Sequence, residues 1–249
     1  MKKTKFALGV LAVLLCGSAG ARNGEVKMRE GTITLPAYRV NAPEKAPLFE
    51  RDFAYQRAKR GVYPYAMNDN PTDEKIDTTY RALFLENDYL EVCVLPDIGG
   101  RLFYATDKTN GYEIFYRQHV IKPANVGMLG AWISGGVEWN VFHHHRATSN
   151  IPCDYRIVEN GDGSKTIWVG ETELRHRMSW AIGMTLYPDR SYIEVKGRFF
   201  NNSPDRNSML HWNNVATHAN ENYQIVFPEN TEFGTFHHKN SFMRWPVPD

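Results

Sequence analysis

Short apolar and aromatic runs separated by turn residues dominate the chain from residue 80 onward. Segment 192–200 is representative, because Ile193 and Val195 alternate with Glu194 and Lys196. Such alternation places every second side chain on one face of an extended strand, so that one face is apolar and the other is wet. The same pattern predicts strands at 81–86, 89–95, 101–105, 112–116, 155–159, 165–174, 177–187, 192–200, 208–217 and 223–227.

Turn signals fall between these segments. Asn87-Asp88, Asn110-Gly111 and the Asn-Gly-Asp-Gly run at 160–163 each suit a tight connection between antiparallel strands. Residues 120–136 are rich in glycine and predict a long irregular loop. The sequence shows neither an amphipathic helical period nor an internal repeat. We therefore predict an all-β protein whose strands form a large sandwich.

Residues 22–78 are the least regular part of the chain. Segment 26–40 has extended character, whereas 67–77 is polar and rich in turn residues. We interpret 22–78 as an N-terminal extension with lead-in strands, and 79–249 as the sandwich domain.

The first 21 residues have the pattern of a signal peptide. Three lysines precede an apolar stretch at 6–15, which is too short to span a bilayer, and Ala19-Gly20-Ala21 offers a cleavage site. Cys16 would be the anchor of a lipoprotein, but Leu15 stands where a small residue is expected. Cleavage after Ala21 is the favoured reading, which places the protein in the periplasm or at the cell surface.

Charge and cysteine content narrow the choice of partners. Removing 1–21 takes away three lysines and no acids, so the formal net charge falls from +1 to about −2. That balance gives no electrostatic reason to expect a nucleic acid partner, and no later stretch is apolar enough to span a membrane. Cys93 and Cys153 remain, either as a disulfide formed after export or as buried thiols.

Segment 135–146, Gly-Gly-Val-Glu-Trp-Asn-Val-Phe-His-His-His-Arg, carries the densest candidate chemistry. It combines groups that move protons, groups that hold hydroxyls and an indole that can stack on a sugar ring. A solvated loop with a chance histidine run is the plain alternative. Another alternative is a metal site, in which His143 and His145 would need Glu138 or His218 as a third ligand.

A second cluster lies at 210–220. On a strand, His211 and Asn213 would share one face, and Trp212 and Asn214 the other. A polar pair facing inward beside an aromatic ring suits a sugar cleft. The alternative is a solvent-exposed edge strand whose histidine forms hydrogen bonds only within the protein.

Three motifs carry a resemblance to a known superfamily: Pro-Asp-Ile-Gly-Gly-Arg-Leu at 96–102, Gly-Gly-Val-Glu-Trp-Asn at 135–140 and His-Trp-Asn-Asn at 211–214. They resemble the galactose mutarotase-like proteins, and more closely the bacterial DUF5107 branch, some members of which carry tetratricopeptide repeats. The resemblance implies a β-supersandwich with a carbohydrate cleft on its concave face. It does not identify a reaction, because the superfamily includes glycosidase, lyase and binding domains.

The resemblance also implies roles for individual residues. Aldose 1-epimerases move one proton off O1 and another onto the ring oxygen, commonly with a Glu base and a His acid. By position, His145 or His144 matches the first histidine of the family and His211 the second, and no cofactor is implied. The residues expected to contact the sugar are Arg101, Trp139, Asn140, His144, Arg146, Trp212 and Asn213.

The family's catalytic Glu lies near its C-terminal end, beyond the part that this chain matches. We therefore expect Asp249 to end an N-terminal portion of a longer protein, and Glu138 becomes the substitute base. Two further functions stay open. A glycoside hydrolase or lyase would need a second carboxylate such as Asp97, and a non-catalytic module would bind sugar without turnover.

Overall fold

The computed structural model describes residues 24–46, 49–50, 61–125, 131–141, 145–175, 177–236 and 241–246. Their regular secondary structure is β-strand, apart from one short 3₁₀ turn, η1, at Pro96–Ile98. The strands are β1 (Lys27–Val40), β2 (Phe49–Glu50), β3 (Gly61–Val62), β4 (Pro71–Glu86), β5 (Leu90–Leu95), β6 (Arg101–Asp107), β7 (Tyr112–Glu113), β8 (Ala124–Asn125), β9 (Ala131–Trp132), β10 (Val137–Val141), β11 (Asp154–Glu159), β12 (Lys165–Thr172), β13 (Met178–Leu186), β14 (Glu194–Asn201), β15 (His211–Val215), β16 (Phe233–Phe236) and β17 (Ser241–Arg244).

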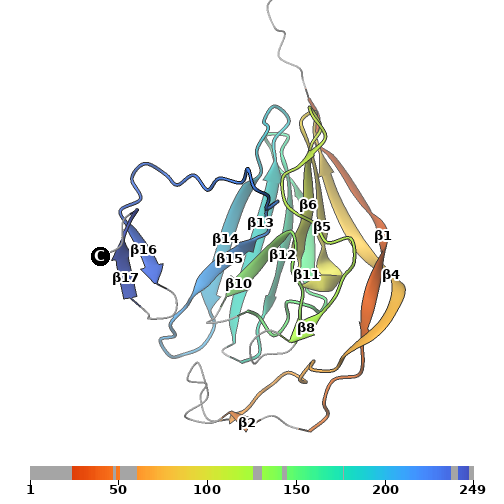
Figure 1. The fold of residues 1–249 in the computed structure, drawn as a ribbon, viewed down its shortest axis with the longest axis vertical. Coiled ribbons are helices and arrows are strands. Elements are labelled where there is room, and N and C mark those ends of the chain that lie inside the picture. The colour runs from red at the N-terminus through yellow and green to blue at the C-terminus, as the bar shows by residue number, and fades with distance from the viewer. Residues whose placement is uncertain are drawn as a thin grey trace, which may run out of the picture.

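Two antiparallel sheets form an all-β sandwich, as the sequence pattern predicted. The seven-stranded sheet has the order β1-β4-β5-β6-β10-β15, with β7 paired to β6. The four-stranded sheet has the order β11-β12-β13-β14 and packs against it (Figure 1). Strands β14 and β15 therefore each lie at an edge of their sheet.

The core follows from the two-residue period of the strands. In β4, Leu83 and Leu85 point between the two sheets, while Ala82 and Phe84 point to the opposite face. The main core lies between the sheets and includes Trp180 from β13. A second apolar cluster covers the outer face of the seven-stranded sheet, where Ile121 from the irregular segment packs over it. Both faces of its central strands β5, β6 and β10 are therefore largely buried.

Strand β4 begins much earlier than the sequence predicted. Residues 71–77 read as polar turn sequence, yet they pair with β1 in one long ribbon whose register runs from Lys27–Glu86 to Tyr38–Lys75. This ribbon curves away from the sandwich at one side (Figure 1). Its side chains there are mostly exposed on both faces, so the apolar alternation that reveals a strand is missing. Because β1 is the edge strand of the large sheet, the N-terminal segment is part of that sheet.

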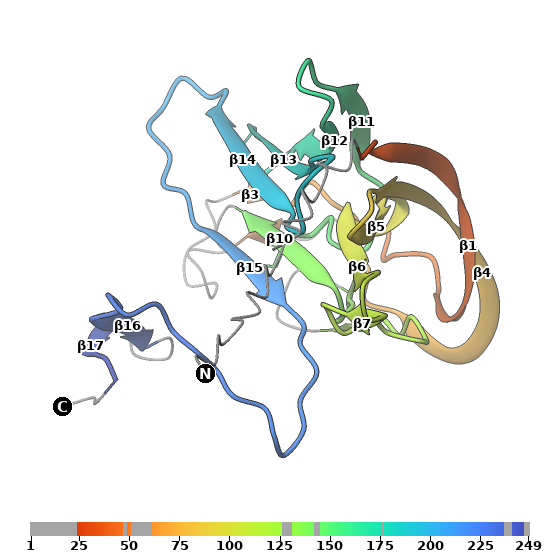
Figure 2. The same cartoon turned by 90° about the horizontal axis from the view of Figure 1, so that it is seen from above.

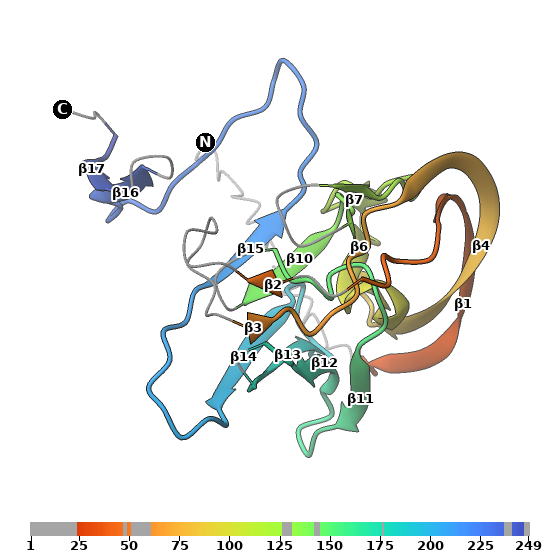
Figure 3. The ribbon, with the colours of Figure 1, turned by 90° about the horizontal axis from the view of Figure 1, so that it is seen from below.

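The C-terminal segment differs from the prediction in a second way. Residues 223–227 are not a strand, and β16 and β17 instead form a hairpin that the pattern did not reveal. Seen from above and from below, this hairpin stands away from the two sheets (Figures 2 and 3). Val226 and Phe242 are 81% and 78% exposed, so this segment buries little of its apolar surface.

Cys93 and Cys153 lie on opposite sides of the seven-stranded sheet. Cys93 belongs to the outer cluster, whereas Cys153 packs against the main core, and both are free. This geometry excludes the predicted disulfide alternative, since the sheet separates the sulfur atoms. Burial raises the pKa of both thiols, that of Cys153 to about 11.

We expect both thiols to be unreactive in the native protein, because the thiolate is the reactive form and little of it exists near neutral pH. A thiol-reactive chromophore should titrate Cys93 and Cys153 in denaturant and neither one quickly under native conditions. A native protein whose mass is lower by two hydrogens would contain a disulfide, and this would contradict the account.

Within the described residues, no helix is long and apolar enough to cross a membrane.

Candidate functional site

Strands β10 and β15 pair side by side and bring the two polar clusters of the sequence together. Their register joins Glu138 to Asn214 and Asn140 to Trp212. Directly paired residues of antiparallel strands point to the same face, so these four side chains share one face. The interleaved Trp139 belongs to the main core, which places the four polar and aromatic side chains on the face turned away from that core.

Glu138 and His145 form the centre of this site. Nδ1 of His145 lies 3.0 Å from Oε2 and 3.2 Å from Oε1 of the Glu138 carboxylate. Nδ2 of Asn214 donates to Oε2 at 2.9 Å. The carboxylate accepts from Nδ1, so it holds one tautomer and one ring orientation of the imidazole. Glu138 is 2% exposed, and it is therefore a fixed group inside the protein.

The electrostatic surroundings keep Glu138 ionised. Burial on its own raises the pKa of this carboxyl, but the polar side chains of His145, Trp132 and Asn140 and the charge of Arg101 outweigh it. Together they lower the pKa of Glu138 to about 2. A carboxylate with so low a pKa is a weak proton acceptor near neutral pH, so it is better suited to orient a neighbouring base than to be one.

Two tryptophans flank the imidazole. The ring centroids of Trp132 and Trp212 lie 5.5 Å and 4.8 Å from that of His145, and each ring meets it edge to face. Nε1 of Trp212 and Nε of Arg101 are buried and complete no hydrogen bond with the described residues. Nε1 of Trp132 and Nδ2 of Asn140 are also buried, and they lie toward the Glu138 carboxylate without the geometry of a full hydrogen bond. Such buried donors are unusual, because buried polar groups are normally satisfied.

Arg101 is 3% exposed and is fixed by backbone carbonyl groups. Its terminal nitrogens donate to Gly135 O at 2.5 Å and Ile133 O at 2.8 Å. The turn that presents these carbonyls depends on Gly136, which has a φ of 61°. A Cβ there would lie 2.2 Å from Leu102 O, so the segment packs directly onto β6. Burial lowers the pKa of Arg101 to about 10, and the charge of Glu138 opposes that shift.

His211 and Asn213 lie on the opposite face of β15 from Glu138. They pair with Val141 and Trp139, whose side chains point into the main core. His211 Nδ1 lies 2.9 Å from Asn140 O, and its ring centroid is 4.8 Å from that of Phe199. The sequence predicted this alternation of faces and placed the His211 and Asn213 face in the site. The structure therefore does not bring His211 or Asn213 to the Glu138–His145 pair.

Arg146 and Trp139 have structural surroundings. Arg146 donates from Nε to Trp139 O at 2.7 Å, from one terminal nitrogen to Thr148 and Glu171, and from the other to Gly99 O at 2.7 Å. Its guanidinium also lies 4.3 Å over the Trp180 ring. Trp139 is 2% exposed and donates to Gly100 O. The predicted ligand contacts through these two residues conflict with their directions, since Trp139 points into the main core and Arg146 is turned toward Trp180.

Two predictions remain: His144 as a ligand contact, and the alternative of a metal site. His144 and His143 lie outside the described residues. Among the residues that are described, no three His, Cys, Asp or Glu side chains are grouped closely enough to hold a metal ion. His218 lies apart from Glu138, with its Nε2 2.8 Å from Glu113 O and its ring beside Tyr112 and Tyr116.

Comparison with known protein families identifies the family of this chain. Residues 57–249 match the model of a family described as "Domain of unknown function (DUF5107)", which covers most of the chain. The chain belongs to the DUF5107 family. A crystal structure of a TPR-domain containing protein from Parabacteroides distasonis is similar, with a TM-score of 0.59 and 24% identity. The match covers 70% of this chain and 29% of that protein, and at this identity it supports the fold alone.

In this DUF5107 chain, sequence reasoning missed Trp132 and Asn214 as members of the site. Trp132 lies within 120–136, the segment predicted to be an irregular loop, and Asn214 was assigned to the face away from the cleft. The two-residue period of β15 already grouped Asn214 with Trp212. Only the pairing with β10 shows that this is the face of Glu138.

Proposed function

We propose that this DUF5107 chain binds a sugar at the face formed by β10 and β15, as a member of the galactose mutarotase-like superfamily. The observation that carries the proposal is the buried Glu138–His145 pair, flanked by Trp132 and Trp212, with buried donors such as Trp212 Nε1 that lack a partner among the described residues. Sugars present many hydroxyl groups, which accept from such donors and donate to a carboxylate, and their apolar ring faces pack on indoles.

If the chain is catalytic, the reaction is proton transfer at the anomeric centre of an aldose. His145 is then the group that exchanges the proton, and Glu138 is a positioning residue that fixes its tautomer through Nδ1. Ring opening requires one proton to leave O1 and another to reach the ring oxygen, so a second group is needed. The resemblance assigns that second role to a histidine or to a C-terminal Glu, and His211 lies on the other face of β15.

A non-catalytic sugar-binding module is the second candidate, and the position of His211 favours it. A glycosidase has less support, because the candidate second acid, Asp97, accepts a hydrogen bond from the Arg81 amide at 2.6 Å in the β4–η1 region. Cleavage by two carboxylates requires them to flank one bond, about 5–9.5 Å apart.

The test is anomer exchange measured by NMR on a panel of aldoses, with wild type and His145→Ala. For an enzyme, the substitution should lower the exchange rate by about 10²–10⁴-fold, as expected for loss of a general acid or base. For a module, wild type shows no exchange above buffer, and His145→Ala weakens sugar affinity. His119→Ala is the matched control, because His119 is exposed and distant in sequence from the pair. Equal exchange and affinity in all three proteins would refute the proposed site.

We also propose export to the periplasm or cell surface, based on the pattern of residues 1–21, which lie outside the described residues. Mass spectrometry of the protein made in a bacterial host with the intact leader should find Arg22 as the first residue. A lipid-modified Cys16, or a full-length chain in the cytoplasm, would contradict cleavage after Ala21.

A further inference from the structure

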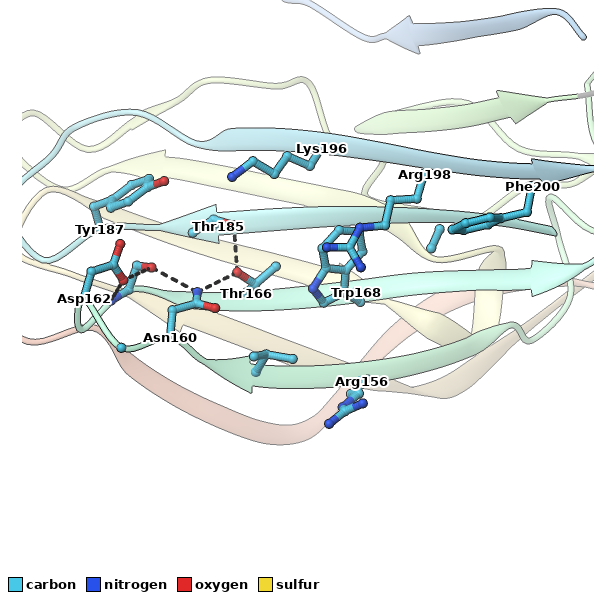
Figure 4. A pocket seen from close by; sticks show the side chains of 14 residues that line it. Arg156, Asn160, Asp162, Thr166, Trp168, Thr185, Tyr187, Lys196, Arg198 and Phe200 are labelled. Atoms are coloured by element: carbon cyan, nitrogen blue, oxygen red, sulfur yellow. Dashed lines mark hydrogen bonds between the residues drawn. The ribbon is translucent and has the colours of Figure 1, made fainter.

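A groove lies on the outer face of the four-stranded sheet, opposite the main core. It has a volume of about 860 Å³ and crosses all four strands of that sheet. Side chains of Arg156, Trp168, Arg198 and Phe200 line one part, and Asn160, Asp162, Thr185 and Tyr187 line the other (Figure 4). With neighbouring strands about 4.8 Å apart, its width of four strands suits an oligomer better than one small anion.

A stacked arrangement fixes Arg198 in this groove. Trp168 pairs with Gly183 on β13, and a Cβ on Gly183 would lie 2.8 Å from the indole. The missing side chain therefore lets the indole lie against the strand. The guanidinium of Arg198 lies 4.4 Å over the ring (Figure 4). Arginine stacks well on indole while its N–H groups stay available in the ring plane, so the cation is oriented without a carboxylate partner.

The cations of the groove are unequally neutralised. Arg156 and Arg198 form no ion pair with any residue that the structure describes, and both are exposed. Lys196, by contrast, pairs with Glu194 at 2.6 Å. Asp162 lies at the opposite end and accepts from Ser164. The arginine end is thus suited to a carboxylate or sulfate group, which planar guanidinium groups bind through paired hydrogen bonds.

The other end presents a chain of neutral polar groups. Asn160 Nδ2 donates to Ser164 Oγ and Thr166 Oγ1, both at 3.0 Å, and the Thr166 and Thr185 hydroxyls lie 2.8 Å apart. These contacts are drawn in Figure 4. Amide and hydroxyl groups of this kind exchange hydrogen bonds with ligand hydroxyls. Nucleic acid would require a cation for each of many closely spaced phosphates, and only two arginines here are unpaired.

We propose that this groove binds an acidic oligosaccharide, with a carboxylate or sulfate ester at Arg156 and Arg198 and neutral hydroxyls at the end formed by Asn160 and Thr185. This surface lies on the opposite sheet from Glu138 and His145, so it is a second site. It would hold a polymer on the outside of the sandwich, and it does not require the first site to be catalytic.

Isothermal titration with three tetrasaccharides of equal length tests the proposal: one of uronic acid, one sulfated and one neutral. We expect either acidic ligand, or both, to bind at least tenfold more tightly than the neutral one, with affinity that falls as salt rises. Arg156→Ala and Arg198→Ala should each reduce that affinity about tenfold. Arg198→Lys, which keeps the charge but loses the planar stack, should fall between wild type and Arg198→Ala.

Arg39→Ala is the matched control, because it removes one exposed cation on β1 that already pairs with Glu74. His145→Ala should leave acidic-glycan binding unchanged, which separates this groove from the proposed sugar site. Thermal melts establish that each variant is folded. Equal affinity for acidic and neutral ligands, equal losses in Arg39→Ala and Arg198→Ala, or tighter binding of a single-stranded oligonucleotide than of the acidic tetrasaccharides would overturn the proposal.

Discussion

Replacing Arg146 with alanine is expected to lower the free energy of unfolding by about 3–5 kcal/mol, the range for breaking a buried charged network. Arg146 is 7% exposed and connects the carbonyls of Trp139 and Gly99 with Glu171, under the Trp180 ring. Its removal leaves the Glu171 carboxylate without its cation and the two carbonyls without a donor. Chemical denaturation at neutral pH measures the loss.

Arg39→Ala serves as the control for this prediction, since an exposed ion pair contributes at most about 1 kcal/mol. Arg146→Lys should recover part of the loss, because an ammonium keeps the charge but cannot reach all of the acceptors in the geometry of a guanidinium. A loss below 1 kcal/mol in Arg146→Ala, together with weaker sugar binding, would return Arg146 to the role of a ligand contact.

Glu138→Gln is expected to remove about 3 kcal/mol of stability at pH 7, by the free energy equivalent of its lowered pKa. The pKa of Glu138 falls from its ordinary 4.5 to about 2 in the folded protein. The carboxylate therefore stabilises the fold fully above the unfolded pKa, and this contribution is lost as the pH falls from about 4.5 towards 2. The gap between wild type and variant should narrow over that window.

Denaturation curves collected from pH 7 to pH 2.5 measure this gap. Glu74→Gln is the matched control, because it makes the same substitution at an exposed position on β4. A gap between wild type and Glu138→Gln that stays constant with pH would mean that the ionised carboxylate is not what stabilises the site.

The sequence predicted the fold class because most strands are buried on at least one face. In β13, Ile182, Met184 and Leu186 alternate with Ala181 and Thr185, and this period identifies a strand without further information. The hydrophobic pattern did not predict the strands whose side chains are mostly exposed. Residues 71–77 form a strand that is wet on both faces, and β16–β17 is a hairpin that stands off the sandwich, so neither shows a hydrophobic period.

Only part of the candidate site could be predicted from the sequence. The density of titratable groups at 135–146 located Glu138 and His145, and the structure brings these two together. The sequence could not reveal that Arg146 turns inward to Trp180. An arginine within a motif can contact either a ligand or a buried aromatic ring, and the sequence alone does not distinguish the two. Nor could it decide the face of β15, because that depends on the register with β10.

The most direct test of the proposed sugar site is a ¹H–¹⁵N spectrum of the six indole N–H groups during titration with a neutral sugar identified in the aldose panel. Nε1 of Trp212 is buried without a partner among the described residues, and Nε1 of Trp132 lies toward the Glu138 carboxylate, whereas Trp139 and Trp180 donate to Gly100 O and Glu171. We predict that the Trp132 and Trp212 signals shift and saturate together, while those of Trp139 and Trp180 stay in place. Saturable binding that leaves Trp132 and Trp212 unmoved would contradict a ligand site at the Glu138–His145 pair.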